Sequence, residues 1–338
     1  MPKSIDTDDY SARLRPRAVD LDGRRLLVAQ LGGSEQEADL SEPVNCGEIG
    51  RIRHFRRDTS EGWPLNDLPI DPACAALGIA STDVLRAQVF QNAACNWRCW
   101  YCFVPYPLLL ASDKRGVWVD ADDLVTRYLA EPDRPAVIDL SGGQPDLVPE
   151  WTPWMMQALA RHGAAGSTYL WVDDNLSNDY FWRYLSDDDI DLVARWPRFG
   201  RVGCFKGFDE DSFAFNTRAE PNLFERQFEL FARHLSLGVD LYAYATFTGP
   251  DSSAVPSGMP AFVDRLQSIH ELLPLRTVPL EVSLWGPVHS RMGPSRRQAL
   301  DVQQRAIEAW NHELDRRFRG DLRALPISSV PMRIAHGG

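Results

Sequence analysis

Three of the six cysteines lie within eight residues, in the segment Cys95-Asn-Trp-Arg-Cys99-Trp-Tyr-Cys102. Thiolates this close together can reach one metal centre, and soft sulfur ligands favour zinc, copper(I) or an iron–sulfur cluster. A structural zinc ion needs four ligands, and an electron-carrying [4Fe–4S] cluster needs four thiolates. Because no fourth cysteine lies nearby, three thiolates would leave one iron of a [4Fe–4S] cluster open to a substrate or cofactor.

Alternating strands and helices surround this segment and must position it. The pattern is typical of parallel βαβ units and predicts an α/β fold, a partial (β/α)6 TIM-like barrel. The strands are expected at 84–90, 136–140, 168–172, 201–205, 239–247 and 278–285. Helices are expected at about 121–130, 150–161, 224–238, 262–273 and 295–318.

Polar groups follow the first four predicted strands directly. They are the cysteine segment, Ser141-Gly142-Gly143-Gln144-Pro145, Asp173-Asp174-Asn175, and Lys206. In α/β barrels, functional groups gather in the loops at the carboxyl ends of the strands. The coincidence at four successive strand ends indicates that these groups share one site.

Composition limits the class of protein. The chain has 338 residues with 44% hydrophobic and 25% charged residues, which is typical of a soluble globular protein. It has no apolar run long enough for a transmembrane helix and no apolar signal-peptide core, so we expect a cytoplasmic protein without membrane contact. The net charge of −11 argues against general nucleic-acid binding, which needs a basic face.

The chain is expected to divide into an N-terminal accessory segment (1–83), a barrel core (84–290) and a C-terminal helix with its tail (291–338). Within the first part, residues 26–29 could form a short strand. Residues 49–57 alternate apolar and basic side chains, which predicts a half-buried strand with a positive face. Its four arginines indicate a solvated edge strand or, alternatively, a site for an acidic group of a substrate. Cys46 and Cys74 are interpreted as small buried cysteines, or as an incomplete metal site with His54.

The cysteine segment resembles the hallmark of the radical S-adenosylmethionine (radical SAM) family. That family carries C-x3-C-x2-C after the first barrel strand, with an aromatic residue before the last cysteine, here Tyr101. The resemblance covers roughly residues 84–290. It implies a [4Fe–4S] cluster held by Cys95, Cys99 and Cys102, with SAM on the fourth iron.

The same resemblance implies the residues that bind SAM. Ser141-Gly142-Gly143-Gln144 looks like the family's Gly-Gly-Glu turn, which holds the amino group of SAM, with Gln144 in place of the usual acid. Two further strand ends look like the branch of the pyruvate formate-lyase-activating enzyme. Asn175 would contact the ribose or the carboxylate of SAM, and Lys206 would pair with the carboxylate, although Cys204 stands where that branch has an acid.

Other polar residues are weaker candidates for the same site. Some alternate on the fifth and sixth predicted strands and could point into the barrel or simply fill it, and His289 follows the sixth strand. These candidates are Tyr242, Tyr244, Thr246, Glu281, Ser283 and His289.

The implied activity is reductive cleavage of SAM to methionine and a 5′-deoxyadenosyl radical. That radical would abstract hydrogen from a small-molecule or peptide substrate, and a flavodoxin- or ferredoxin-type protein would supply the electron. Two alternatives stay open. The protein could be an activase that makes a glycyl radical on a partner protein, or a non-catalytic metal-binding protein with a three-cysteine site.

Overall fold

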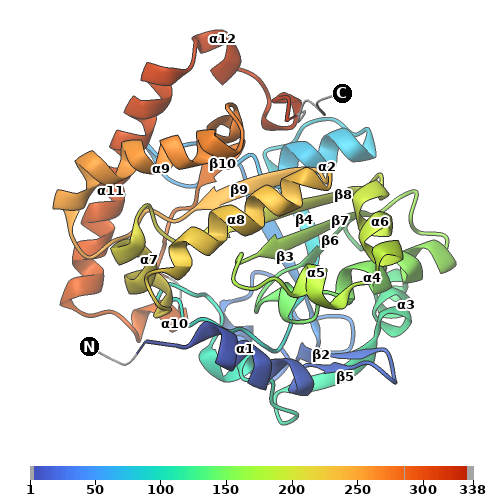
Figure 1. Cartoon of the computed structure of the whole chain (residues 1–338). Helices are drawn as coiled ribbons and strands as arrows, with labels where there is room; N and C mark the ends of the chain where they lie inside the picture. The colour runs from blue at the N-terminus through green and yellow to red at the C-terminus, as the bar shows by residue number, and fades with distance from the viewer. Residues whose placement is uncertain (1–3, 285, 333–338) are drawn as a thin grey trace.

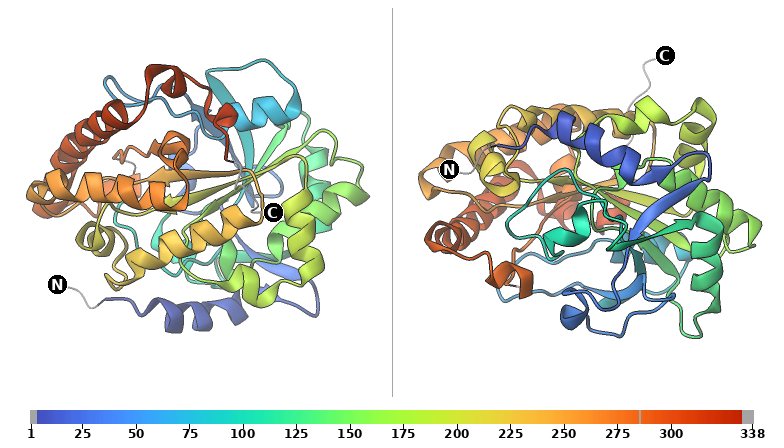
Figure 2. Two further views of the ribbon diagram at one scale, coloured as in Figure 1. Left: turned by 45° about the horizontal axis from the view of Figure 1, so that its top comes forward. Right: turned by 90° about the horizontal axis from the view of Figure 1, so that it is seen from below.

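A curled sheet of seven strands forms the centre of the protein, with helices around it (Figures 1 and 2). A computed structural model describes residues 4–284 and 286–332. The sheet has the order β10-β9-β8-β7-β6-β4-β3. Its strands are β3 (Gly50–Arg56), β4 (Val84–Phe90), β6 (Val137–Leu140), β7 (Tyr169–Asp174), β8 (Phe199–Phe205), β9 (Leu241–Ala245) and β10 (Thr277–Pro279).

Six of these strands, β4 and β6 to β10, run parallel, and only β3 pairs antiparallel, with β4. The predicted α/β class with a curled, half-barrel sheet is therefore confirmed, whereas six complete strand–helix units stay a prediction. A second, antiparallel sheet contains β1 (Val19–Asp20), β2 (Arg25–Ala29) and β5 (Gly116–Asp120). Strand β5 was not predicted.

The helices occupy the connections between strands and both ends of the chain. They are α1 (Thr7–Leu14), α2 (Ile70–Leu77), α3 (Ala121–Ala130), α4 (Trp151–Arg161), α5 (Tyr180–Tyr184), α6 (Asp187–Arg195), α7 (Glu210–Thr217), α8 (Leu223–Ser236), α9 (Val255–Ile269), α10 (Gly286–His289), α11 (Pro294–Arg317) and α12 (Gly320–Arg323). In the part of the chain that the structure describes, none of them is long and apolar enough to cross a membrane.

The two faces of the main sheet have different partners. Alternate residues such as Phe90, Leu140 and Val172 point outward into one large core with the surrounding helices. The residues between them point inward, because successive side chains of a strand face opposite sides of a sheet.

The inner face is itself divided along the strands. Near the strand starts it is apolar, and α2 with Ile70 and Ala73 packs against side chains such as Tyr169 and Trp171. Near the strand ends it carries polar residues, among them Asp139 on β6 and Arg51 on β3. Their Cα atoms lie in one row across the sheet, since both pair with Val89 of β4. The carboxyl end of the curled sheet therefore has an interior lined by charge.

Some predicted boundaries agree with the structure and others do not, such as the helix expected at about 262–273, which is α9 (Val255–Ile269). The first strand and the helix of residues 121–130 have the predicted bounds, and Asp120 caps that helix by accepting from the Asp123 N–H. The sixth strand was predicted over 278–285 but ends at Pro279, and residue 285 lies outside the described residues. The N–H of Leu280 still donates to the Ala245 carbonyl oxygen at 2.8 Å, and the pairing with β9 ends there.

Candidate active site at the carboxyl ends of the strands

The cysteine loop leaves β4 and is held by the protein on several sides. Cys95 and Cys99 are buried and Cys102 is half-buried. Arg98 donates from Nη1 to the carbonyl oxygens of Cys95 and Trp97, both at 2.7 Å. The Tyr106 hydroxyl donates to the Cys99 carbonyl oxygen at 3.0 Å. The loop thus has a fixed backbone with its three thiols on one short segment.

A second arginine closes the far end of the loop. Arg291, which follows α10, donates from Nη1 to the Cys102 carbonyl oxygen at 2.6 Å and from Nη2 to the Val104 carbonyl oxygen at 3.0 Å. Its guanidinium lies 3.8 Å from the centre of the Tyr106 ring. Because hydrogen bonds from charged donors are among the stronger ones, Arg291 acts as a clamp on the loop.

Burial controls the acidity of the three thiols. It raises the pKa of Cys99 to about 12 and also raises the pKa values of Cys95 and Cys102. The positive charge of Lys206 acts in the opposite direction on all three. Lys206 is 8% exposed and lies just past the end of β8. The structure therefore brings Lys206 to the cysteine loop.

Asn175 reaches the same loop from the end of β7. Its Nδ2 lies 3.7 Å from the Cys95 sulfur, which makes it a weak donor to that atom. Its carbonyl oxygen accepts from Gln227 of α8 at 3.0 Å, which fixes the strand end. Two of the residues predicted to bind SAM are thus next to the predicted metal ligands.

The Gly142-Gly143 turn also abuts the cysteine loop. Gly143 has φ +72°, and a Cβ there would lie 2.3 Å from the Asn92 carbonyl oxygen and 2.6 Å from that of Ala94. A side chain at this position would collide with the backbone that leads into the loop, so only glycine fits. The next N–H, of Gln144, donates to the Ala94 carbonyl oxygen at 2.8 Å.

The polar side chains of this turn hydrogen bond within the protein. Gln144 donates from Nε2 to Asp174 Oδ1 at 2.7 Å and accepts from the Asn175 N–H at 3.0 Å. Ser141 donates to Asp139 Oδ2 at 2.9 Å. The side-chain amide of Gln144 links the ends of β6 and β7. Because the polar side chains of the turn are already bonded, the predicted contact with SAM would have to use the backbone of the turn.

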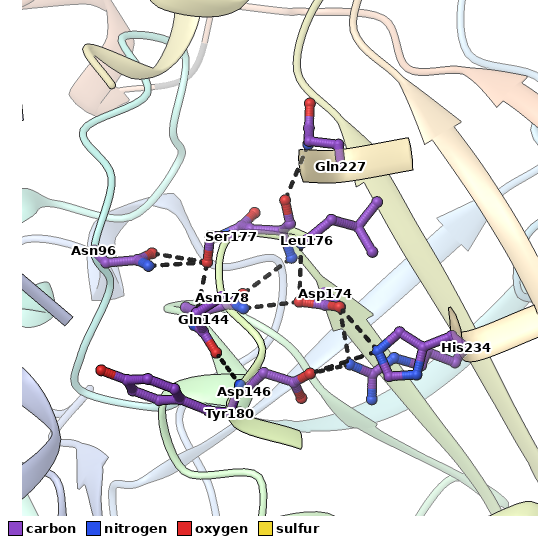
Figure 3. Close-up of polar contacts among 12 residues, drawn as sticks. Asn96, Gln144, Asp146, Asp174, Leu176, Ser177, Asn178, Tyr180, Gln227 and His234 are labelled. Atoms are coloured by element: carbon purple, nitrogen blue, oxygen red, sulfur yellow. Dashed lines mark hydrogen bonds and ion pairs between the residues drawn. The ribbon is translucent and has the colours of Figure 1, made fainter. Parts of the chain in front are cut away.

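A buried polar cluster lies behind the site, and the sequence did not reveal it. Figure 3 shows Asp146 and Asp174 pointing toward His234 of α8. Arg201 of β8 pairs with both carboxylates, and its Nη2 lies 2.9 Å from Asp174 Oδ2. Burial holds the pKa of His234 well below its ordinary value. Within the described ranges, this is the one set of three possible ligands whose donor atoms lie within 4.8 Å of one another. Since Arg201 already pairs with both carboxylates, we interpret the cluster as structural.

Most of the weaker candidates lie apart from the thiols or bond elsewhere, whereas Thr246 lies beside the Tyr101 hydroxyl of the cysteine loop. Ser283 and His289 are exposed, and Glu281 follows the end of β10. The Tyr244 hydroxyl donates to the Leu68 carbonyl oxygen at 2.9 Å, and that of Tyr242 donates to Asp240 at 2.8 Å.

The residues of the N-terminal segment that could have bound metal are also separate from one another. Cys46 and Cys74 are buried, and His54 pairs with Glu42 at 2.9 Å. Over the described part of the chain, these three do not form a set with closely spaced donor atoms.

The basic strand of residues 49–57 agrees only in part with the interpretation as a solvated edge strand. β3 is an edge strand as expected, but Arg51 is only 5% exposed and Arg53 pairs with Asp139 and Asp173 on the inner face. The prediction of a solvated strand is therefore wrong for Arg51 and correct for Arg56, which is exposed. Side chains alternate along a strand, so Arg51 and Arg53 face inward while Arg56 faces solvent.

Comparison with known proteins gives only distant structural matches. No protein-family model and no curated protein matches the chain. Streptococcus suis SuiB bound to S-adenosylmethionine matches with a TM-score of 0.37 and 13% identity, over 52% of this chain and 36% of SuiB. SuiB bound to the precursor peptide SuiA gives 0.36 and 11%, over 57% and 48%. The anSMEcpe protein with bound AdoMet and the Cp18Cys peptide gives 0.37 and 18%, over 55% and 48%. The chain thus spans half or less of the length of these proteins. Structural similarity and sequence identity as low as these assign no activity to it.

Proposed function

We propose that this protein is a radical SAM enzyme with a [4Fe–4S] cluster on Cys95, Cys99 and Cys102. The observation that carries the proposal is the convergence at one edge of the sheet. The loop after β4 supplies three thiols, the loop after β6 supplies a glycine turn pressed against them, and the ends of β7 and β8 supply Asn175 and Lys206. A metal-binding loop alone would need none of these neighbours.

The donors suit an iron–sulfur cluster better than a single zinc ion. Among the described residues, the three cysteine sulfurs do not fall within 4.8 Å of one another as a set. Three thiolates on one zinc ion would lie roughly 3.8 Å apart, given Zn–S bonds of about 2.3 Å. Sulfurs with wider spacing favour a centre with several metal atoms, and three sulfurs leave one position of such a centre open.

The bound cluster and SAM would supply one-electron cleavage of the sulfonium to a 5′-deoxyadenosyl radical. In this proposal, Lys206 holds the carboxylate of SAM, Asn175 and the backbone of Gly142 and Gly143 position the rest of it, and Tyr101 covers the loop. Lys206 also favours the thiolate form of the three ligands. The inner face of the curled sheet then receives a substrate, a small molecule or a peptide, and an electron donor of flavodoxin or ferredoxin type docks outside.

The test is anaerobic reconstitution with iron and sulfide, reduction with dithionite, and incubation with SAM. We expect about four irons per chain and formation of 5′-deoxyadenosine together with methionine. Colourless protein that contains zinc without iron or sulfide would overturn the proposal in favour of a non-catalytic metal protein. A loaded, reduced protein that makes no 5′-deoxyadenosine would contradict the catalytic part.

Matched cysteine variants test the ligand assignment. Cys99→Ala removes one of the proposed ligands and should abolish both the cluster and SAM cleavage. Cys74→Ala removes a buried cysteine of α2, on the apolar part of the inner face, and should leave the iron content unchanged. A full [4Fe–4S] complement in Cys99→Ala would show that the ligands are wrongly assigned.

A further inference from the structure

Arg51 carries a buried guanidinium that the protein leaves partly unbonded. The residue is 5% exposed, and its Nε and Nη2 atoms have no hydrogen-bond partner among the residues that the structure describes. The ring of Phe103, which directly follows the third cysteine, lies 5.2 Å from the guanidinium carbon. Arg51 is therefore next to the cysteine loop, and two of its donor atoms are unbonded.

The charges around Arg51 are already assigned to other partners. Arg53, two residues along β3, pairs with Asp139 at 3.4 Å and Asp173 at 3.6 Å. Within residues 4–284 and 286–332, Arg51 has no ion pair of its own. Burial and the neighbouring Arg53 lower its pKa to about 10, so it stays protonated at neutral pH. Asp139 and Asp173 attract it from a distance, but neither carboxylate pairs with it directly.

A buried guanidinium with unbonded donors lowers the stability of the fold unless a ligand binds it. A buried donor without a partner costs roughly 1–3 kcal/mol, and more when it is charged. Solvent does reach this face, because the side chains of Arg53 and Asp173 are 25% and 21% exposed. A ligand that enters from the carboxyl end of the sheet can therefore reach Arg53, and Arg51 lies two residues from it on the same face of β3.

We propose that Arg51, backed by Arg53, binds an oxyanion of the substrate and makes this enzyme specific for a carboxylate- or phosphate-bearing molecule. A planar guanidinium matches these anions with two parallel hydrogen bonds, which fix orientation as well as affinity. The anion would hold the substrate beside the cysteine loop, so that the hydrogen to be removed lies near the radical. This inference rests on the proposed function and names its substrate class.

The experiment uses the full chain without its cluster, so that it does not depend on catalysis. Glutarate and inorganic phosphate serve as separate probes of a carboxylate and a phosphate. Binding is followed by the Nε–Hε signals of 15N-labelled arginines and by the change in Tm. We compare the wild type, Arg51→Met, and the control Arg56→Met, which changes an exposed arginine of the same strand.

The expected result is that one probe shifts the Arg51 signal and raises the Tm of the wild type and of Arg56→Met. Arg51→Met should bind that probe about tenfold more weakly or worse, since a hydrogen bond to a charged group is lost. Without any anion, Arg51→Met should melt higher than the wild type, because a buried guanidinium with unbonded donors has been removed. The probe that binds identifies the anion as carboxylate or phosphate.

Equal binding by Arg51→Met, or no binding of either probe to the wild type, would overturn the inference. A further measurement separates it from the SAM site. In cluster-loaded protein, Arg51→Met should bind SAM as the wild type does, whereas a tenfold loss would assign Arg51 to SAM and reject the substrate role. If the wild type forms no cluster but still binds the probe through Arg51, the proposed reaction fails and the anion site stands.

Discussion

Burial is the property shared by the three cysteine thiols, and it determines how they can bind a metal. Metal binds the thiolate form, so each ligand must lose a proton on binding. Burial raises the pKa values of all three thiols, whereas the ammonium of Lys206 lowers them. The three thiols therefore stay protonated until a cluster binds, and Lys206 then helps to balance the negative charge of the thiolates.

Asp139 shows how the same interior gives the protein a pH dependence. It is fully buried, its Oδ1 has no hydrogen-bond partner in the described chain, and burial together with Asp173 raises its pKa from 3.8 to about 7. Because the folded state binds this proton more tightly than the unfolded state, the free energy of unfolding should fall as the pH rises from about 4 to about 7.

The corresponding prediction concerns Asp139→Asn. The amide has no charge to lose, so the fall in stability between about pH 4 and about pH 7 should become smaller, and the variant should be more stable than the wild type by roughly 1–3 kcal/mol at pH 8. Urea unfolding across this range measures it, with the exposed Asp22→Asn as control. An unchanged pH slope would show that Asp139 does not titrate in this range.

At the scale of elements, hydrophobic periodicity predicted those strands and helices whose bounds depend on the local sequence. Val84–Phe90 is a run of strand-forming residues, and Ala121–Ala130 has a capping aspartate and one apolar face, so both were predicted correctly. Strand β5 has only five residues with one buried, which gives a weak periodic signal. The role of Gln144 could not be predicted, because its partners on β7 lie about thirty positions away and meet it only in the folded chain.

The candidate site, like the fold, could be predicted in part from the sequence. Functional groups of α/β barrels gather at the strand ends, and this rule predicted that Lys206 and Asn175 lie near the cysteine loop. It could not show that Arg51 faces inward, since this depends on the register of β3 with β4. Nor could it show the two arginines that hold the loop, because Arg291 is distant in sequence and hydrogen bonds only to backbone.

The clamp by Arg291 gives a prediction at this scale. Arg291→Ala removes the donors to the Cys102 and Val104 carbonyl oxygens, worth roughly 1.5–3 kcal/mol for a charged group. The loop should then open locally more often. Loss of iron from the reconstituted protein to a chelator should be about tenfold faster or more, with a small change in Tm. Arg297→Ala, at an exposed position of α11, is the matched control. Equal rates in both variants would contradict the clamp.

At the scale of the whole molecule, the N-terminal segment is in contact with the site. The Thr7 hydroxyl of α1 accepts from the Trp97 Nε1–H at 3.0 Å, and the Ser11 hydroxyl accepts from Asn96 at 2.9 Å. Both partners lie inside the cysteine loop. The same segment contributes β3 to the main sheet. The division at residue 84 stays a prediction, but these contacts indicate that residues 1–83 help to form the site.

This contact leads to a prediction about long-range support of the loop. Thr7 and Trp97 are 0% and 1% exposed, so Thr7→Val keeps the shape but leaves a buried indole N–H without its acceptor. The expected loss is roughly 1–3 kcal/mol of stability, together with faster loss of iron, because the unpaired N–H lies between Cys95 and Cys99. The measurements are Tm and chelator-dependent iron release, with Asp9→Ala on the exposed side of α1 as control. If Tm falls while iron release is unchanged, α1 stabilises the fold without supporting the loop, and the N-terminal segment would be an accessory to the site.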